Sequence, residues 1–318
     1  MQAGDTKAGP VWVAGADTLI GGAIVDALLR RGIAVVDADA NQRSTALDLT
    51  DAKAVDDFVA RVRPRQVYLA AGESGGIAYN QQHPATLMLH NLQVLTSILP
   101  AAARHGVGKL LYLASSCSYP RACPQPMAIS SLHTGPLEPT NVAYAMAKLS
   151  GIELVRAFRR EHRAPFVTVI PANAFGPGDD FSEENSHVVG ALLRRFDAAK
   201  RDGADSVTIW GTGRPRREFV YAPDLAEACL FVMERYDSDD PINVGSGQDH
   251  SIAELAALCA QVVGFTGEIR YDTGRPDGMP EKRLDAGPLH KLGWRDTTPL
   301  ALALKDTYAW YCQTRNRG

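Results

Sequence analysis

Cysteine is scarce in this sequence and follows no disulfide or metal-binding pattern. A disulfide framework or a thiolate-bound zinc site would need paired, closely spaced cysteines, and the eight histidines do not cluster either. We therefore expect free thiols, a reducing cytoplasmic compartment and no metal site. The five cysteines are Cys117, Cys123, Cys229, Cys259 and Cys312.

Long apolar runs and a strong charge of one sign are also missing. No apolar segment approaches the roughly 20 residues that a helix needs to span a bilayer. Residues 1–10 are small and polar, so we expect a disordered start and no signal peptide. The net charge of −3 gives no electrostatic reason to expect nucleic acid or a membrane surface as a partner.

Short apolar runs alternate with helical patterns through the first half of the chain. This alternation predicts an α/β protein with a Rossmann-type, doubly wound parallel sheet that helices cover on both faces. The apolar runs lie at 11–15, 33–36, 67–71, 109–115 and 165–171, and the helical patterns at 20–29, 51–62, 86–105 and 144–158.

A glycine-rich turn, Gly15 to Gly22, joins the first expected strand to the first expected helix. Such turns let backbone N–H groups and a helix N-terminus approach a pyrophosphate. Thr18 stands where the middle glycine of the fingerprint would be, so an ordinary strand–helix turn is the alternative. Asp39 follows Gly15 by 24 residues, near the place where an acidic side chain binds the ribose of NAD, although a polar loop would also hold an aspartate there.

The carboxyl ends of the expected strands carry residues suited to binding. Gly15, Asp39, Ala71, Gly72 and Ser115 all fall at such ends. Ligands of parallel α/β sheets bind at this edge, so the placement predicts a dinucleotide site.

After about residue 172 the sequence no longer alternates regularly between strand and helix patterns. We predict a disordered start at 1–10, an NAD(P)-binding domain at 11–172 with contributions from later segments, and a smaller mixed α/β lobe, mainly for substrate, at 173–318. The later segments read as a loop at 173–180, a helix at 188–199, a strand at 207–210, helices at 225–234 and 252–263, and loops that hold Arg214, Arg216, Arg217 and Lys282.

Tyr144 and Lys148 lie four residues apart in a run that is typical of a helix. Positions i and i+4 share a helix face, so both side chains should point into the same space. An ammonium beside a phenol lowers the phenol pKa, which suits proton transfer to a sugar or alcohol oxygen. A helix with one exposed lysine and one half-buried tyrosine is the alternative, because this spacing also occurs by chance.

Ser115, Tyr144 and Lys148 resemble the Ser/Tyr/Lys arrangement of the extended short-chain dehydrogenase/reductase superfamily. There the serine hydroxyl holds the substrate oxygen, the tyrosine transfers its proton, and the lysine binds the nicotinamide ribose and tunes the tyrosine. Further motifs narrow the resemblance to the GDP-L-fucose synthase family. Its members are GDP-4-keto-6-deoxy-D-mannose 3,5-epimerase-4-reductases. These motifs lie at 114–120, 125–127, 137–141, 185–188, 192–196, 210–213, 217–219, 242–247 and 276–278.

The resemblance assigns Cys117 and His187 to the acid/base pair of epimerisation. A 4-keto group acidifies the hydrogens at C3 and C5, and inversion needs a base on one face and an acid on the other. Cysteine and histidine both titrate within reach of neutral pH, which suits this exchange. Without the resemblance, Cys117 would be a small buried hydrophobe and His187 a residue that caps a helix.

The resemblance also implies a cofactor, a substrate and an assembly. The cofactor is NADP(H) or NAD(H), the substrate is a GDP-linked 4-keto-6-deoxyhexose, and the assembly is a homodimer built on the helices at 86–105 and 144–160. Surface charge is the alternative for the basic residues, above all for Arg214 and Arg216. The implied cofactor-binding residues are Gly15, Thr18, Leu19, Ile20, Gly21, Asp39, Asp48, Leu49, Ala70, Ala71, Gly72, Asn91, Tyr144, Lys148, Pro171, Asn173 and His187. The implied substrate-binding residues are Ser116, Asn173, Asn185, Arg195, Trp210, Arg217 and Lys282.

The phosphate turn departs from many bacterial members of the family. They have His-Arg-Gly where this chain has Ala16-Asp17-Thr18, and their arginine meets the 2′-phosphate of NADPH. The acidic segment Asp37–Asp39 replaces a further basic residue, and Arg43 is the only basic candidate nearby. NADPH is the family default, but these residues favour NADH.

Other functions remain open from the sequence. The nearest is a relative that acts on another nucleotide-linked 4-keto sugar, as an epimerase only or a reductase only. A 4,6-dehydratase usually has Asp-Glu after the catalytic Ser or Thr, where this chain has Ser116-Cys117. A non-catalytic dinucleotide-binding scaffold tends to lose the Tyr or Lys, and both are kept here.

Overall fold

A parallel sheet forms the centre of the larger lobe. The computed structural model describes residues 9–36, 47–183, 186–275 and 277–315. All neighbouring strands in this five-stranded sheet run parallel, in the order β1-β2-β3-β4-β8. The strands are β1 (Val11–Ala14), β2 (Gln66–Leu69), β3 (Lys109–Leu113), β4 (Phe166–Pro171) and β8 (Ile242–Val244).

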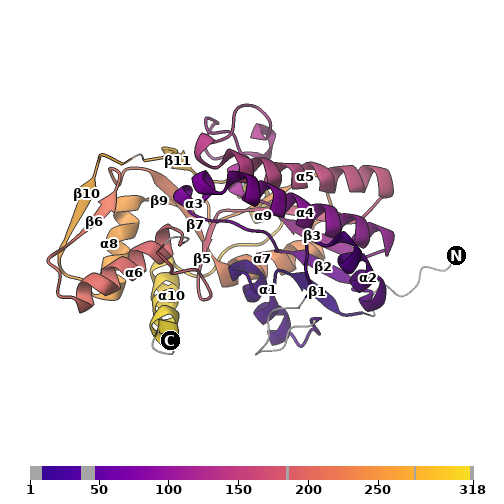
Figure 1. Ribbon diagram of the computed structural model, residues 1–318, viewed down its shortest axis with the longest axis horizontal. Coiled ribbons are helices and arrows are strands. Elements are labelled where there is room, and N and C mark those ends of the chain that lie inside the picture. The colour runs from indigo at the N-terminus through magenta and orange to yellow at the C-terminus, as the bar shows by residue number, and fades with distance from the viewer. Residues whose placement is uncertain (1–8, 37–46, 184–185, 276, 316–318) are drawn as a thin grey trace.

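Helices pack on the sheet in two layers, which explains why the strands are apolar on both faces. Helix α4 packs against α2 and α5, whereas α1 packs against α7 (Figure 1). Side chains such as Trp12 of β1 and Phe58 of α2, whose ring centres lie 4.9 Å apart, fill the space between the sheet and the helices. These helices are α1 (Leu19–Arg30), α2 (Ala52–Val62), α4 (Pro84–Arg104), α5 (Val142–His162) and α7 (Ala222–Arg235).

Side-chain caps define where several helices begin. The Asp51 carboxylate accepts hydrogen bonds from the amides of Lys53 at 2.9 Å and Ala54 at 3.0 Å at the start of α2. Ser251 and Glu254 form a capping box on α8 (Ile252–Val263). Each cap contributes about 1 kcal/mol, because it satisfies N–H groups that have no partner within the helix.

The smaller lobe has its own hydrophobic core, centred on Phe175, Leu193, Phe196, Leu255 and Leu304. The smaller lobe lies at the left of Figure 1, with α10 at its lower end. Its helices are α6 (Val188–Arg201), α8 and α10 (Leu300–Arg315), and its strand pairs are β6 (Ser206–Trp210) with β10 (Glu268–Asp272), and β7 (Arg216–Tyr221) with each of β5 (Asn173–Phe175), β9 (Asp249–Ser251) and β11 (Glu281–Lys282). The remaining α-helices are α3 (Ile77–Gln82) and α9 (Gly287–Lys291).

Segments from the second half of the chain complete the larger lobe. Buried side chains of α7 and β8, such as Leu225, Ala228 and Val244, belong to the same core as β1 and α1. The assignment of 11–172 to the cofactor and 173–318 to the substrate stays a prediction. No helix in the described part of the chain is long and apolar enough to cross a membrane.

The structure confirms the fold class and corrects several elements. The expected strand at 33–36 is reduced to a single bridge between Val35 and Val11. The expected loop at 173–180 begins with β5, and α3 was not predicted. Arg216 and Arg217 lie in β7 and Lys282 lies in β11, not in loops. β11 has only two polar residues and β7 begins with two arginines, so pairing with partners distant in sequence defines these strand positions.

Candidate active site

The glycine turn after β1 is closely packed. Gly15 has a φ of +87°, and a Cβ there would lie 2.6 Å from the amide nitrogen of Ala71. Thr18 donates a hydrogen bond to the Gly15 carbonyl at 2.8 Å and accepts one from the Gly21 amide at 3.0 Å. The missing middle glycine is therefore replaced by a threonine that caps α1.

The start of α1 offers free donors. The Gly22 amide bonds to the Thr18 carbonyl, but the amides of Leu19 and Ile20 have no hydrogen-bond acceptor among the described residues. A helix N-terminus with unsatisfied N–H groups favours an anion. The turn therefore fits the diphosphate of a nicotinamide dinucleotide.

The end of β2 is held beside this turn by a buried amide. Asn91 on α4 is 3% exposed, and its Nδ2 donates to the carbonyls of Leu87 at 2.8 Å and Glu73 at 2.9 Å. It thereby anchors the segment that follows β2. The Ala70 amide donates to the Ala14 carbonyl at 2.9 Å, which joins the ends of β1 and β2. Ala70 and Ala71 therefore border the turn, and Gly72 lies against Asn91.

The expected contacts to the adenosine end are only partly described. The Asp48 carboxylate is exposed, and Thr50 hydrogen bonds from its hydroxyl at 2.7 Å and its amide at 2.8 Å hold the pKa of this carboxyl below its usual range. Leu49 packs against the core of the larger lobe. Asp39, with Asp37 and Arg43, lies outside the described residues.

The structure brings Ser115, Tyr144 and Lys148 together. Ser115 follows β3, and its hydroxyl oxygen accepts a hydrogen bond from the Cys117 amide at 3.2 Å. Lys148, which is 8% exposed, donates to the Leu113 carbonyl at 3.2 Å. Its ammonium lies 5.9 Å from the centre of the Tyr144 ring.

The electrostatics of this group differ from the expectation. Burial raises the pKa of Tyr144 above its ordinary value, the nearby Cys117 adds to the rise, and a hydrogen bond with Ser115 opposes it. Burial lowers the pKa of Lys148 to about 8. Burial therefore outweighs the fall in the phenol pKa that we expected from Lys148, whose ammonium donates to a carbonyl of β3.

The pKa of Cys117 is lowered, whereas the pKa of Cys123, Cys229 and Cys259 is raised. Its Sγ accepts hydrogen bonds from Asn141 Nδ2 at 3.2 Å and Lys282 Nζ at 3.3 Å. Burial by itself would raise its pKa, but the Lys282 charge and the surrounding hydrogen bonds bring the thiol pKa below its ordinary value. Burial raises the pKa of Cys123, Cys229 and Cys259. This surrounding favours acid/base chemistry at Cys117 over simple packing.

His187 occupies the position before α6 without capping that helix through its side chain. Although the residue has an exposed face, the protein around the imidazole lowers its pKa. Asp180 opposes this shift and Lys282 adds to it. Both Cys117 and His187 therefore lie within the electrostatic reach of Lys282.

The expected substrate residues fall into two groups. In the first group, Ser116 is buried beside Cys117 in the chain, and Asn173 donates to the Glu218 carbonyl at 3.0 Å; Pro171, which was expected at the cofactor, ends β4. Burial lowers the pKa of Arg217, the register partner of Lys282.

The second group lies on α6 and β6 of the smaller lobe. Arg195 on α6 donates to the Thr208 carbonyl of β6. Trp210 ends β6 with 61% of its surface exposed, and the Arg275 guanidinium lies 4.9 Å above its ring. Asn185 lies outside the described residues.

Sequence reasoning missed Asn141 as a site residue. Its amide is one of the donors to the Cys117 sulfur, and its Oδ1 is buried without a partner in the described structure. Its position directly before the helix that carries Tyr144 and Lys148 was the available signal.

Comparison with known proteins agrees with the fold and with the family that the sequence resembles. Residues 11–245 match the NAD dependent epimerase/dehydratase family. A putative GDP-L-fucose synthase 2 of Arabidopsis thaliana is 44% identical over 96% of this chain and 93% of its own length. GDP-L-fucose synthase of Escherichia coli (strain K12) is 42% identical over 96% of this chain and 98% of its own length.

Solved structures give the same result. A GDP-L-fucose synthetase from Naegleria fowleri bound to NADP superposes with a TM-score of 0.87 at 27% identity, over 97% of this chain and 95% of that one. A GDP-6-OMe-4-keto-L-xylo-heptose reductase from C. jejuni has a TM-score of 0.89 at 27% identity, over 98% and 99% of the two chains. The resemblance in the sequence is confirmed, and the chain belongs to the NAD dependent epimerase/dehydratase family, among its GDP-L-fucose synthases.

Proposed function

We propose that the protein converts GDP-4-keto-6-deoxy-D-mannose to GDP-L-fucose, as a 3,5-epimerase and 4-reductase that uses a nicotinamide cofactor. One observation carries the proposal. The reducing group of Ser115, Tyr144 and Lys148 adjoins a thiol, Cys117, whose surroundings favour the thiolate. A simple reductase has no need of that second group.

Reduction relies on residues at the ends of β3 and α5. When bound, the nicotinamide supplies the hydride, and the turn at Gly15 with the Leu19 and Ile20 amides would hold its diphosphate. Ser115 holds the C4 oxygen of the sugar, and Tyr144 donates the proton to that oxygen. A phenol is protonated at neutral pH at its ordinary pKa, and burial raises the pKa of Tyr144 further, so the proton to be donated is present.

Epimerisation relies on Cys117 and His187. The keto group at C4 acidifies C3 and C5, since the electron pair left by the proton delocalises onto the C4 oxygen as an enolate. Cys117 removes the proton from one face, and His187 serves as the acid for the opposite face. The lowered thiol pKa supports the first role, because more of the thiolate is present at neutral pH.

A two-step assay tests this function. In deuterated water without reduced cofactor, NMR should show deuterium entering C3 and C5 of GDP-4-keto-6-deoxymannose. Adding reduced cofactor should then give GDP-L-fucose. If cofactor is oxidised but no deuterium enters the sugar, the chain is a simple reductase.

A second candidate is reduction without epimerisation on another GDP-linked keto sugar. It is favoured by the similarity to the GDP-6-OMe-4-keto-L-xylo-heptose reductase from C. jejuni. The same assay with a GDP-4-keto-heptose separates the two, because the preferred sugar should show the higher kcat/KM.

We also propose that NADH serves at least as well as NADPH. The turn residues Ala16, Asp17 and Thr18 bring no positive charge toward a 2′-phosphate. An acidic side chain near that phosphate would cost more than about 1 kcal/mol in a partly buried site. Steady-state kinetics with both cofactors is the test, and a tenfold higher kcat/KM for NADPH would overturn this preference.

We propose a homodimer that pairs α4 and α5 across a two-fold axis. These helices pack side by side and leave Leu89, Val142 and Met146 exposed, at 58%, 45% and 41%. Light scattering at micromolar concentration should give twice the mass of 34.3 kDa. Leu89→Glu should weaken the dimer, whereas a monomeric wild type would exclude it.

A cytoplasmic location is part of the proposal. All five cysteines are free thiols, and Cys117 must stay reduced to exchange protons. Fractionation of the producing cell tests this location.

A further inference from the structure

Lys282 contacts a reacting atom. It lies in β11 and pairs in parallel register with Arg217 of β7, so both cations share a face of the sheet. Its Nζ lies 3.3 Å from the Cys117 sulfur, although the two residues are 165 positions apart in the sequence. The resemblance assigned Lys282 to substrate binding, and a flexible surface lysine could bind a substrate phosphate. A hydrogen bond to the Cys117 sulfur requires the lysine side chain to be held in one place.

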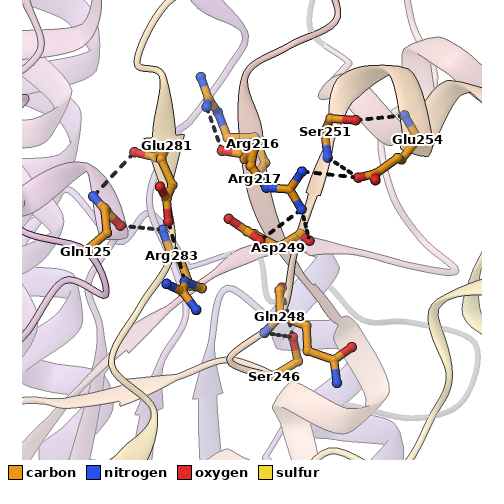
Figure 2. A network of polar contacts seen from close by, with 10 residues as sticks. All are labelled: Gln125, Arg216, Arg217, Ser246, Gln248, Asp249, Ser251, Glu254, Glu281 and Arg283. Atoms are coloured by element: carbon orange, nitrogen blue, oxygen red, sulfur yellow. Dashed lines mark hydrogen bonds and ion pairs between the residues drawn. The ribbon is translucent and has the colours of Figure 1, made fainter.

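The backbone on both sides of Lys282 is held by one side chain. Gln125 donates from Nε2 to the Glu281 carbonyl at 3.4 Å and accepts from the Arg283 amide through Oε1 at 3.0 Å. Figure 2 shows Gln125 bridging this strand, beside the strand that carries Arg216 and Arg217. The two bonds fix the peptide groups that flank Lys282.

A buried carboxylate holds the same segment on its other side. Glu218 is 1% exposed, and its oxygens accept hydrogen bonds from the Leu284 amide at 2.7 Å and the Gly247 amide at 2.6 Å. The Met127 amide also donates to the Arg283 carbonyl at 2.7 Å. The path of the chain through Lys282 is thereby set by hydrogen bonds on both sides of this residue.

The charges around the thiol single out Lys282. Lys282 and Arg217 face Cys117 from β11 and β7, and Tyr144 and Lys148 face it from α5. Ser115 and Asn141 add neutral hydrogen bonds. In the described part of the chain, Lys282 is the only charged group that both faces the sulfur and hydrogen-bonds to it.

We propose that Lys282 is the counter-ion that holds Cys117 as a thiolate for epimerisation, and that Gln125 and Glu218 position it. This rests on the proposed function. The thiolate takes the proton next to the keto group, so a C–H bond breaks, an S–H bond forms, and the electron pair moves to the enolate oxygen. Lys282 keeps its protons throughout and stabilises the charged sulfur before the transfer.

Alkylation of Cys117 tests the proposal without any substrate. The rate of modification by iodoacetamide, followed on the Cys117 peptide by mass spectrometry, rises with pH as the thiolate forms. The pH at which this rate is half of its maximum is the midpoint. Lys282→Met should raise the midpoint by about one pH unit or more, whereas Lys282→Arg should raise it much less. Lys291→Met makes the same change at an exposed lysine of α9 and should leave the midpoint in place. An unmoved midpoint in a folded Lys282→Met protein, as judged by circular dichroism, would overturn the proposal.

Two further measurements complete the test. Gln125→Ala keeps Lys282 but frees its strand, so the midpoint should move in the same direction by less; no movement would remove Gln125 from the proposal. In the deuterium assay, Lys282→Met should shift the pH profile of exchange upward. If KM rises but the pH profile does not move, Lys282 binds the substrate diphosphate and is not the counter-ion of Cys117. If the wild type exchanges no deuterium, the proposed function fails, and the alkylation profile still decides the role of Lys282.

Discussion

The ammonium of Lys148 lies 5.9 Å from the centre of the Tyr144 ring and donates its hydrogen bond to the Leu113 carbonyl at 3.2 Å. The ammonium also lies over the ring of Tyr112, 5.5 Å from its centre. The positive charge is thus enclosed by aromatic rings and a strand end, near the phenol without bonding to it. This arrangement leaves the proton on Tyr144 and makes Lys148 costly to bury.

Tyr144→Phe should abolish reduction of the keto sugar and leave the cofactor bound. The change removes the proton donor and little volume, so the packing around α5 stays intact. We expect a loss of at least about 10²-fold in kcat, which is the usual contribution of a general acid. Cofactor binding can be followed by fluorescence titration. Tyr236→Phe, which removes a hydroxyl bonded to the Asp240 carbonyl, is the matched control. Full turnover by Tyr144→Phe would remove this residue from the mechanism.

Lys148→Met should stabilise the protein at neutral pH, and the gain should shrink as the pH rises. Burial lowers the pKa of Lys148 from 10.5 to about 8, so between these values the folded protein binds fewer protons than the unfolded chain. Stability therefore rises with pH in that window, and the cost of the buried ammonium is full below pH 8.

Urea unfolding of both proteins at about pH 7 and about pH 9.5 measures this effect. We expect a gain on the order of 1–2 kcal/mol at the lower pH, after the loss of the hydrogen bond to Leu113. An equal difference at both pH values would contradict the assignment. The variant should also bind cofactor more weakly, because the proposed ribose contact is lost.

Cys117→Ser should separate the two halves of the reaction. A serine hydroxyl has a pKa far above neutrality, even beside Lys282, so deuterium exchange at C3 and C5 should fall by about 10² or more. Reduction should persist on the unepimerised sugar and give a D-manno-type product such as a rhamnose, which NMR identifies. Cys123→Ser is the control, since burial raises the pKa of that thiol and it should not take part.

Gly151→Ala should destabilise the protein through α5. A Cβ at this position would lie 2.4 Å from the Tyr112 ring and hydroxyl, and Tyr112 is 1% exposed. The hydroxyl of Tyr112 donates to the Lys148 carbonyl at 3.2 Å, so the overlap cannot be relieved without moving the catalytic helix. We expect a loss of about 1–3 kcal/mol in the free energy of unfolding. Thermal melts should show a lower Tm than for Ser150→Ala, the neighbouring control, and equal values would contradict this packing.

Local patterns in the sequence determined the fold class and much of the reducing group. The alternation of apolar runs and helical patterns is enough for a parallel α/β sheet, and the structure confirms it. The spacing of Tyr144 and Lys148 places them on one helix face, and Ser115 follows a strand that ends beside that helix. Each of these signals lies within a few residues, where helix and strand geometry translates sequence directly into position.

Tertiary structure alone decided the surroundings of Cys117 and the direction of the pKa shifts. Lys282 reaches the sulfur from a two-residue strand whose formation depends on pairing with Arg216 and Arg217. No local periodicity encodes such a strand. Burial is the largest cause of the shifts at Tyr144 and Lys148, and it depends on how α5, β3 and the loops close around them. The sequence therefore determined which groups are present, whereas long-range packing decided the direction in which their pKa values shift.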